Sequence, residues 1–254
     1  MLRPSLAVGV SLVGLSLTAP VRAADLAEVR RAQRLEVTVA AASAFEKDIL
    51  TGFARALGVE LHVVSANTPE AALGALAEGK ADLACGGFIS EMLRNDRVVA
   101  SSEVFPNRML IVNRKPAEPI QFIEQLRNER TAAAKDTPAP DVLSGAKVPR
   151  VDASMSTVKV LGALSSGSIT AGAVPLFDAL HARTEDAGLQ LGVYLGPRLS
   201  VAFALRSADS GLLKALNAHL ATVRASSSFR LLVSRHFGDA TLQELARAKL
   251  NEPR

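Results

Sequence analysis

The 254-residue chain has few aromatic side chains and almost no cysteine. It contains no tryptophan, one tyrosine and nine phenylalanines. Cys85 is the only cysteine, which excludes a disulfide within the chain, and its apolar neighbours predict a buried core residue. The scarcity of rings limits how a pocket could hold a solute by stacking.

Signatures of catalysis and of metal binding are missing as well. The chain has no G-x-S-x-G motif, no phosphate-binding P-loop and no dinucleotide fingerprint. Its four histidines are scattered without metal-ligand spacing, and no histidine lies close in sequence to Cys85. We therefore expect no enzyme, no catalytic residue, no metal site and no cofactor. The four histidines are His62, His181, His219 and His236, and the last two, in the helical C-terminal region, are predicted to be surface or packing residues.

The first 23 residues have the pattern of a secretory signal peptide. Arg3 precedes an apolar run over residues 6–19, Pro20 ends the run, and Val21-Arg22-Ala23 resembles a cleavage site. The run is too short to favour a membrane span. The cleavage point has no cysteine, so a lipid anchor is not expected. We expect cleavage after Ala23 and a periplasmic mature protein without membrane insertion.

The charge of the mature chain is nearly balanced. The formal net charge is +4 and falls to +2 without Arg3 and Arg22. No basic stripe with interleaved aromatic residues is present, so nucleic acid is not an expected partner. No feature indicates self-association, and we expect a monomer.

The first part of the mature chain alternates the patterns of strands and helices. Strands are predicted over residues 35–42, 59–66 and 81–87. Helices are predicted over 25–33, 45–58 and 70–79, with Gly58 as a C-cap and Pro69 at a helix start. This β-α-β-α-β order predicts a parallel sheet with crossover helices.

The second part repeats this rhythm after an irregular connector over residues 116–149, which contains five prolines and one predicted helix near 120–134. We predict two α/β lobes, with lobe I over 24–108 and 199–254 and lobe II over 109–198. The predicted strands are one near 105–113 and those over 168–175, 189–196 and 199–207. The predicted helices are one carrying Val158, Leu161 and Leu164, one over 175–186 and two within 210–238.

Four short motifs occur in a characteristic order. They are R-L-E-V-T-V at 34–39, F-E-K-D-I-L at 45–50, A-L-A-E-G-K-A-D-L-A-C-G-G at 75–87 and F-R-L-L-V-S-R-H-F-G at 229–238. This order resembles the type II periplasmic solute-binding proteins that serve polar amino acid ABC importers. The resemblance implies a two-lobe α/β fold with a ligand cleft between the lobes, an ABC importer permease as partner, and structural roles for Asp48 and Asp82.

The resemblance also implies which residues bind the solute. In the family, an arginine after the glycine pair binds the ligand carboxylate, and Arg94 matches that place, with Arg97 as an alternative. The plain alternative for Arg94 is a solvated surface arginine. For Ser43 and for the Ser154–Thr157 turn, the alternative is helix N-capping. The predicted ligand-binding residues are Ser43, Gly87, Phe88, Ser90, Arg94, Ser154, Ser156 and Thr157.

Two departures from the family pattern bear on the ligand. The family carries an acidic residue at the end of the strand that corresponds to 170–174, where this chain has Val174 and Pro175, with Asp178 a helical turn further on. The segment after the first strand also lacks the aromatic residue of the family. Because a buried ammonium without a partner costs several kcal/mol, a carboxylate or another small polar solute without a cation fits these residues better.

Two functions remain open at the level of the sequence. The first is a binding protein that closes two lobes on a small polar or anionic solute and delivers it to an ABC importer. The second is an accessory protein of another periplasmic system, such as a dehydrogenase, that keeps the fold with a degraded pocket.

Overall fold

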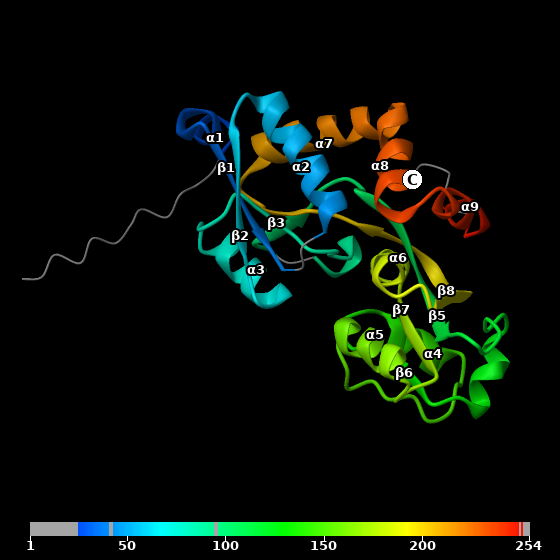
Figure 1. Cartoon of the computed structure of the whole chain (residues 1–254). Coiled ribbons are helices and arrows are strands. Elements are labelled where there is room, and N and C mark those ends of the chain that lie inside the picture. Colours follow the sequence, from blue (N-terminus) through cyan, green and yellow to red (C-terminus); the bar gives the residue numbers. More distant parts are fainter. Residues whose placement is uncertain (1–24, 41–42, 94–95, 249, 251–254) are drawn as a thin grey trace, which may run out of the picture.

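The computed structural model describes residues 25–40, 43–93, 96–248 and 250, which form two lobes of mixed α/β structure (Figure 1). The strands are β1 (Arg34–Val39), β2 (Glu60–Ser65), β3 (Leu83–Cys85), β4 (Val98–Ala100), β5 (Phe105–Arg114), β6 (Thr131–Ala133), β7 (Ala171–Pro175), β8 (Leu189–Val201) and β9 (Ala204–Arg206). The α-helices are α1 (Leu26–Ala32), α2 (Ala44–Leu57), α3 (Pro69–Ala77), α4 (Ala139–Gly145), α5 (Thr157–Ser166), α6 (Leu176–Glu185), α7 (Ser210–Ala225), α8 (Ser227–Phe237) and α9 (Ala240–Arg247). The two 3-10 helices are η1 (Ser90–Met92) and η2 (Ile123–Asn128). The predicted two-lobe α/β class is confirmed.

Lobe I is built on a five-stranded sheet with the order β2-β1-β3-β9-β4. Strands β2, β1 and β3 are parallel, and β9 runs antiparallel between β3 and β4. Helix α2 begins at its N-cap Ser43 and ends at Gly58, whose φ of 73° few residues other than glycine adopt. The apolar side of α2 is fully buried, and each large side chain there contributes roughly 1.5–3 kcal/mol of stability.

Lobe II is built on a four-stranded sheet with the order β6-β7-β5-β8. The central strand β5 is antiparallel to both β7 and β8, and β6 is parallel to β7. The predicted helix over 120–134 is wrong, because this segment contains the 3-10 helix η2 and the buried strand β6. Short apolar runs cannot be assigned by periodicity, and pairing of Ala132 and Ala133 with β7 decides this one.

The chain crosses between the two sheets at residues 101–104 and 202–203. The predicted boundaries after residues 108 and 198 fall inside the long strands β5 and β8, so the division into lobes by residue number stays a proposal. Strand β8 is continuous over Leu189–Val201, where two separate strands were predicted. Its pairing with β5 shifts register near Arg108, which accommodates the positive φ of Gly196, and the pairing then continues on the other side.

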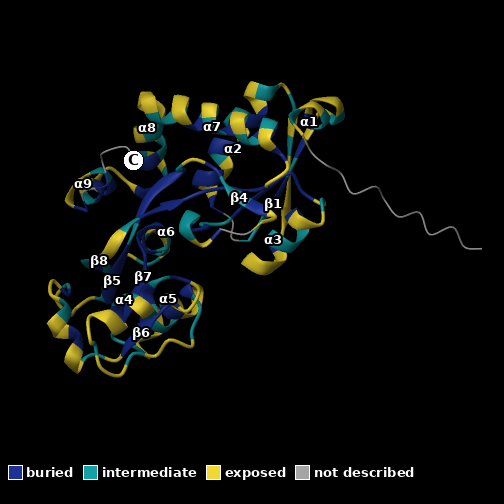
Figure 2. Cartoon of the chain, turned by 180° about the vertical axis from the view of Figure 1, so that it is seen from behind, coloured by how far each residue is buried: buried dark blue, intermediate teal, exposed yellow. Residues whose placement is uncertain are grey.

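One hydrophobic core cluster extends through both lobes. Its centre is a group of phenylalanine rings from α2, β5, α6 and α8, with centroid separations of 5.2–6.2 Å among Phe45, Phe105, Phe177, Phe229 and Phe237. Helix α6 follows a strand of lobe II and yet packs against helices of lobe I. Figure 2 shows the central strands buried and the outer sides of α7 and α8 exposed. The edge strand β2 is exposed at most of its positions.

The C-terminal helix α9, which was not predicted from the sequence, lies beside β8 (Figure 1). Tyr194 on β8 donates a hydrogen bond of 3.1 Å to Glu244, and the Arg247 guanidinium lies 5.2 Å from the centre of the Tyr194 ring. Leu245 of α9 is buried in the core. Among the described residues, no helix is both long and apolar enough to span a membrane.

Candidate functional site

The carboxyl ends of β1, β3, β6 and β7 point toward the space between the lobes, which is where open α/β sheets bind ligands. A cavity of about 430 Å³ lies there. Lobe I contributes Ser43 and Glu46 at the start of α2 together with Gly86 and Gly87 after β3, and lobe II contributes one side each of α5 and α6.

A larger open groove of about 860 Å³ lies at the opposite ends of β1 and β2. It is lined by residues near Gln33, Arg55 and Glu60, at the amino ends of these parallel strands. We place the candidate site in the smaller cavity, because only there do both sheets and two helix N-termini converge.

The carboxylate of Glu46 is fully buried at the lobe I side of this cavity. Its Oε1 atom accepts hydrogen bonds from the backbone N–H groups of Gly86, at 3.3 Å, and Gly87, at 3.2 Å. Its Oε2 atom is buried without a hydrogen-bond partner among the described residues. Burial raises the pKa of Glu46 to about 7, although the two backbone N–H groups favour the charged form.

Gly87, the second glycine after β3, is required by its backbone conformation. Gly87 has a φ of 71°, and a Cβ atom added there would lie 3.4 Å from the Phe177 ring and 3.6 Å from the Asp178 carboxylate. Lobe I backbone therefore approaches the first turn of α6 directly, and Gly87 allows both the conformation and the approach.

Asp178 lies in the first turn of α6 and lines the cavity from the lobe II side. Burial, and then repulsion from Asp136, raises the pKa of Asp178 to about 7. The expectation that no carboxylate serves the end of the strand at 170–174 is therefore wrong. Strand β7 leads into α6 without a loop, and the first helical turn carries Asp178 back over the strand end.

The N-terminus of α5 is occupied by a carboxylate of the protein itself. Asp136 Oδ1 accepts hydrogen bonds of 2.9 Å from both the N–H and the hydroxyl of Thr157. In the turn before it, Asp152 accepts hydrogen bonds from the N–H and hydroxyl of Ser154 at 2.8 and 2.7 Å. The hydroxyls of Ser154 and Thr157, which were predicted to bind the solute, are thus bonded within lobe II.

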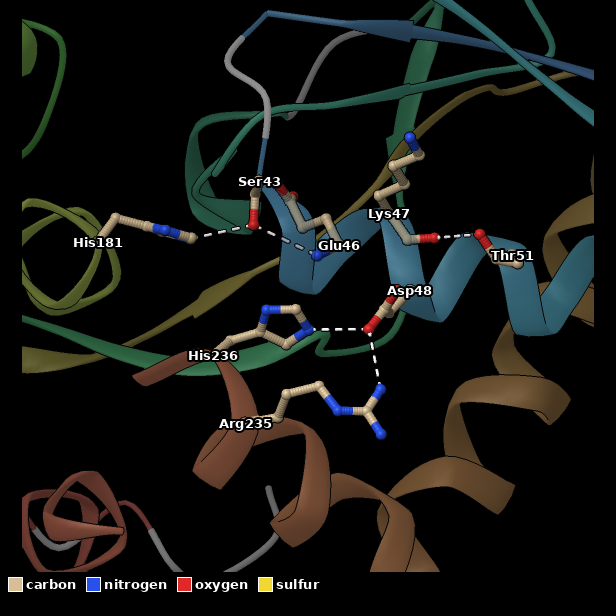
Figure 3. A network of polar contacts seen from close by, with 8 residues as sticks. All are labelled: Ser43, Glu46, Lys47, Asp48, Thr51, His181, Arg235 and His236. Atoms are coloured by element: carbon tan, nitrogen blue, oxygen red, sulfur yellow. Dashed lines mark hydrogen bonds and ion pairs between the residues drawn. The ribbon is translucent and has the colours of Figure 1, made fainter. Parts of the chain in front are cut away.

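A polar contact joins the two lobes at the edge of the cavity (Figure 3). Ser43 Oγ accepts the Glu46 N–H at 3.2 Å as the N-cap of α2, and it lies 3.0 Å from His181 Nε2 on α6. Burial, with a smaller effect of His236, lowers the pKa of His181 to about 4, so its ring is neutral near pH 7. The tautomer of the ring sets which of the two groups donates in this hydrogen bond. His236 makes a separate contact of 2.9 Å with Asp48.

The predicted ligand-binding residues divide into three groups. Ser43, Gly87 and Thr157 line the cavity. Phe88, Ser90, Ser154 and Ser156 do not: Phe88 packs in the lobe I core, Ser90 donates to Glu91 at 2.8 Å, Ser154 is exposed and Ser156 is the N-cap residue of α5. Arg94 lies outside the described residues, and the alternative Arg97 is exposed beside β9. Solute contacts of all these residues stay predictions.

The cavity residues that were missed from the sequence include Glu46, Asp178 and His181. Glu46 belongs to the F-E-K-D motif, and its position one residue after a core phenylalanine was the available signal. Asp178 and His181 are three residues apart on one side of α6, a spacing that places both on the same helical face.

Comparison with known proteins gives one family and many solved structures of the same fold. The model of the bacterial extracellular solute-binding proteins, family 3, matches residues 42–239. A mutant of ArgBP from T. maritima is 21% identical, with a TM-score of 0.68, over 84% of this chain and 98% of that chain. A comparison with curated protein sequences gave no match.

Two further structures show the range of similar proteins. An amino acid ABC transporter substrate-binding protein from Streptococcus pneumoniae, bound to L-arginine, is 20% identical with a TM-score of 0.71, over 83% of this chain and 96% of that chain. The unliganded, open L-cystine solute receptor of Neisseria gonorrhoeae is 12% identical with a TM-score of 0.63, over 85% and 98% of the two chains. With its fold and inter-lobe cavity, and with the family model matching most of its length, the chain belongs to the bacterial extracellular solute-binding proteins of family 3.

Proposed function

We propose that this solute-binding protein works in the periplasm, where it holds a small polar solute in the cavity between its lobes and presents it to an ABC importer permease. The observation that carries the proposal is the cavity itself, because residues of both lobes line it and a solute there would contact both at once. A solute that binds both lobes favours their closed arrangement over an open one, which is the population shift that a receptor of this kind requires.

The two connections between the lobes support this role. The two connections between the sheets are short extended segments at 101–104 and 202–203, and such paired segments can absorb the change in backbone angles that a hinge motion needs. His181 of helix α6 and Ser43 are in contact at one edge of the cavity. Closure of the lobes about the two connecting segments would therefore bring these two residues into contact.

A binding screen on the mature chain, residues 24–254, tests the proposal. Polar amino acids, amines, organic acids and sugars are added one at a time, and the melting temperature is measured. A solute at 100 times its Kd stabilises the native state by about 2.7 kcal/mol, which raises the melting temperature of a chain of this size by about 5–10 °C.

The control is a pair of variants. Asp178→Asn, in the cavity, should remove or strongly reduce the shift, whereas Glu124→Gln, on the exposed 3-10 helix η2, should keep it. No shift with any solute, on a protein that melts cooperatively, would contradict solute capture and favour an accessory role for the same fold.

A further inference from the structure

Two positions in the inter-lobe site are suited to bind the carboxylate of a solute, and both are already occupied. One consists of the backbone N–H groups of Gly86 and Gly87, which donate to Glu46. The other is the N-terminus of α5, where Thr157 donates to Asp136 through its N–H and its hydroxyl. A solute carboxylate would have to displace a carboxylate of the protein from either place.

The charged side chains that line the cavity are acidic. Four carboxylates and no lysine or arginine are found among the described residues that line it. Asp186 is already paired with Arg114 and with Ser165. Glu46 Oε2 is fully buried and lacks a hydrogen-bond partner within the described part of the chain. A donor group of the solute could satisfy this acceptor atom.

Asp178 provides a second carboxylate acceptor, on the lobe II side of the cavity. It lies close to Gly87, and its charge is near enough to Glu46 to raise the pKa of that carboxyl. A single positively charged donor group between α2 and α6 could therefore contact both Glu46 and Asp178. Such a group would replace the protons that these two carboxyls hold near pH 7.

Part of the cavity lining from α5 and α6 is apolar. Val158, Leu161 and Phe177 line it, and Val158 has 75% of its surface exposed. An aliphatic stem of several methylene groups would cover this side and shield it from water. An α-carboxylate beside the stem would meet no described lysine or arginine in the cavity lining.

We propose that the solute of this protein is an alkyl amine or alkyl guanidine without a carboxylate, its cationic head held between Glu46 and Asp178 and its stem along α5. This inference rests on the proposed function, since it specifies the solute of the same cavity. It distinguishes the chain from a receptor for amino acids, whose ligands carry a carboxylate as well as an ammonium.

Pairs of solutes that differ only in the carboxylate test the inference. The pairs are agmatine and arginine, cadaverine and lysine, and putrescine and ornithine, measured by isothermal titration calorimetry at about pH 8, where both cavity carboxylates are mostly ionised. We expect at least one amine to bind about tenfold or more tightly than its amino acid partner, which corresponds to about 1.4 kcal/mol.

Variants separate the contributions of the two carboxylates. Asp178→Asn should weaken amine binding about tenfold or more, and Glu124→Gln should leave it unchanged. Glu46→Gln serves as a second test where its circular dichroism and melting curve show a folded protein. Unchanged amine affinity in Asp178→Asn would overturn the placement of the cationic head.

The possible failures are distinguishable. If each amino acid binds more tightly than its amine and Arg94→Ala removes that binding, a carboxylate site exists and the inference is wrong while solute capture stands. If only sugars or organic acids bind, the inference is again wrong and solute capture stands. If nothing in the wider screen binds, the proposed function itself fails.

Discussion

Ser43 at the N-terminus of α2 and His181 on α6 lie 3.0 Å apart, and they join the two lobes at the edge of the candidate site. The same Ser43 oxygen caps α2 by accepting the Glu46 N–H. One hydroxyl therefore fixes the start of the helix that carries Glu46 and also contacts the helix that carries Asp178.

Replacing this hydroxyl should cost more than the loss of a helix cap. We expect Ser43→Ala to lower the free energy of unfolding by about 1–2 kcal/mol, since a capping bond and the contact with His181 are lost together. Thr68→Ala is the matched control, because Thr68 caps α3 in the same way and makes no hydrogen bond to the described residues of the other lobe. Urea unfolding measures both variants, and an equal loss in the two would show that the His181 contact adds no stability.

Gly87→Ala should destabilise the protein and weaken solute binding. A side chain at a φ of 71° is strained, and its Cβ would press toward Phe177 and Asp178. We expect a loss of about 1–3 kcal/mol in unfolding free energy. Gly74→Ala, in helix α3 with no heavy atom within 4 Å of the added Cβ, should instead stabilise by about 0.5–1 kcal/mol. Equal effects of the two changes would contradict the close approach of the lobes at Gly87.

The phenylalanine group between the lobes should dominate core stability. Phe177 is 2% exposed and contacts the rings of Phe45, Phe105 and Phe237. We expect Phe177→Ala to cost about 3–5 kcal/mol, whereas Phe122→Ala, at a ring that is 68% exposed, should change stability by less than about 0.5 kcal/mol. Chemical denaturation measures the difference, and a small effect of Phe177→Ala would mean that α6 does not help to join the lobes.

The unliganded protein should lose stability as the pH rises toward neutrality. The folded-state pKa values of Glu46 and Asp178 are about 7, above their ordinary values of 4.5 and 3.8, so the folded state holds more protons than the unfolded chain between these limits. Stability from these carboxyls is full at low pH and is lost as pH rises through about 7. His181 acts in the opposite direction between about 4 and 6.5, because the unfolded chain binds its proton more tightly.

Comparison with a variant isolates the carboxylate effect. Between about pH 6.5 and pH 8, above the range in which His181 titrates, Asp178→Asn should lose less unfolding free energy than the unchanged chain. Thermal melts at several pH values measure this difference. An equal loss in the two proteins would mean that Asp178 is already ionised well below neutrality.

The local pattern of the sequence determined the elements that pack against one another in a regular way. The apolar spacing of α2, the caps at Ser43 and Gly58 and the β-α-β order predicted lobe I before the structure was seen, and the motif order predicted the family. These features depend on side chains close together in the chain, so they are readable from sequence alone. The predicted helix over 120–134 failed because pairing with β7 outweighs a weak local preference.

The chemistry of the cavity was decided by the tertiary structure. Glu46 and Asp178 are 132 positions apart in sequence, and only the packing of α6 against lobe I brings their charges together. The hydrogen bond from the Thr157 N–H to Asp136 is likewise a contact between separate segments. Sequence alone therefore determined the two-lobe fold and its family, whereas burial and long-range contacts decided that the site between the lobes is lined with carboxylates.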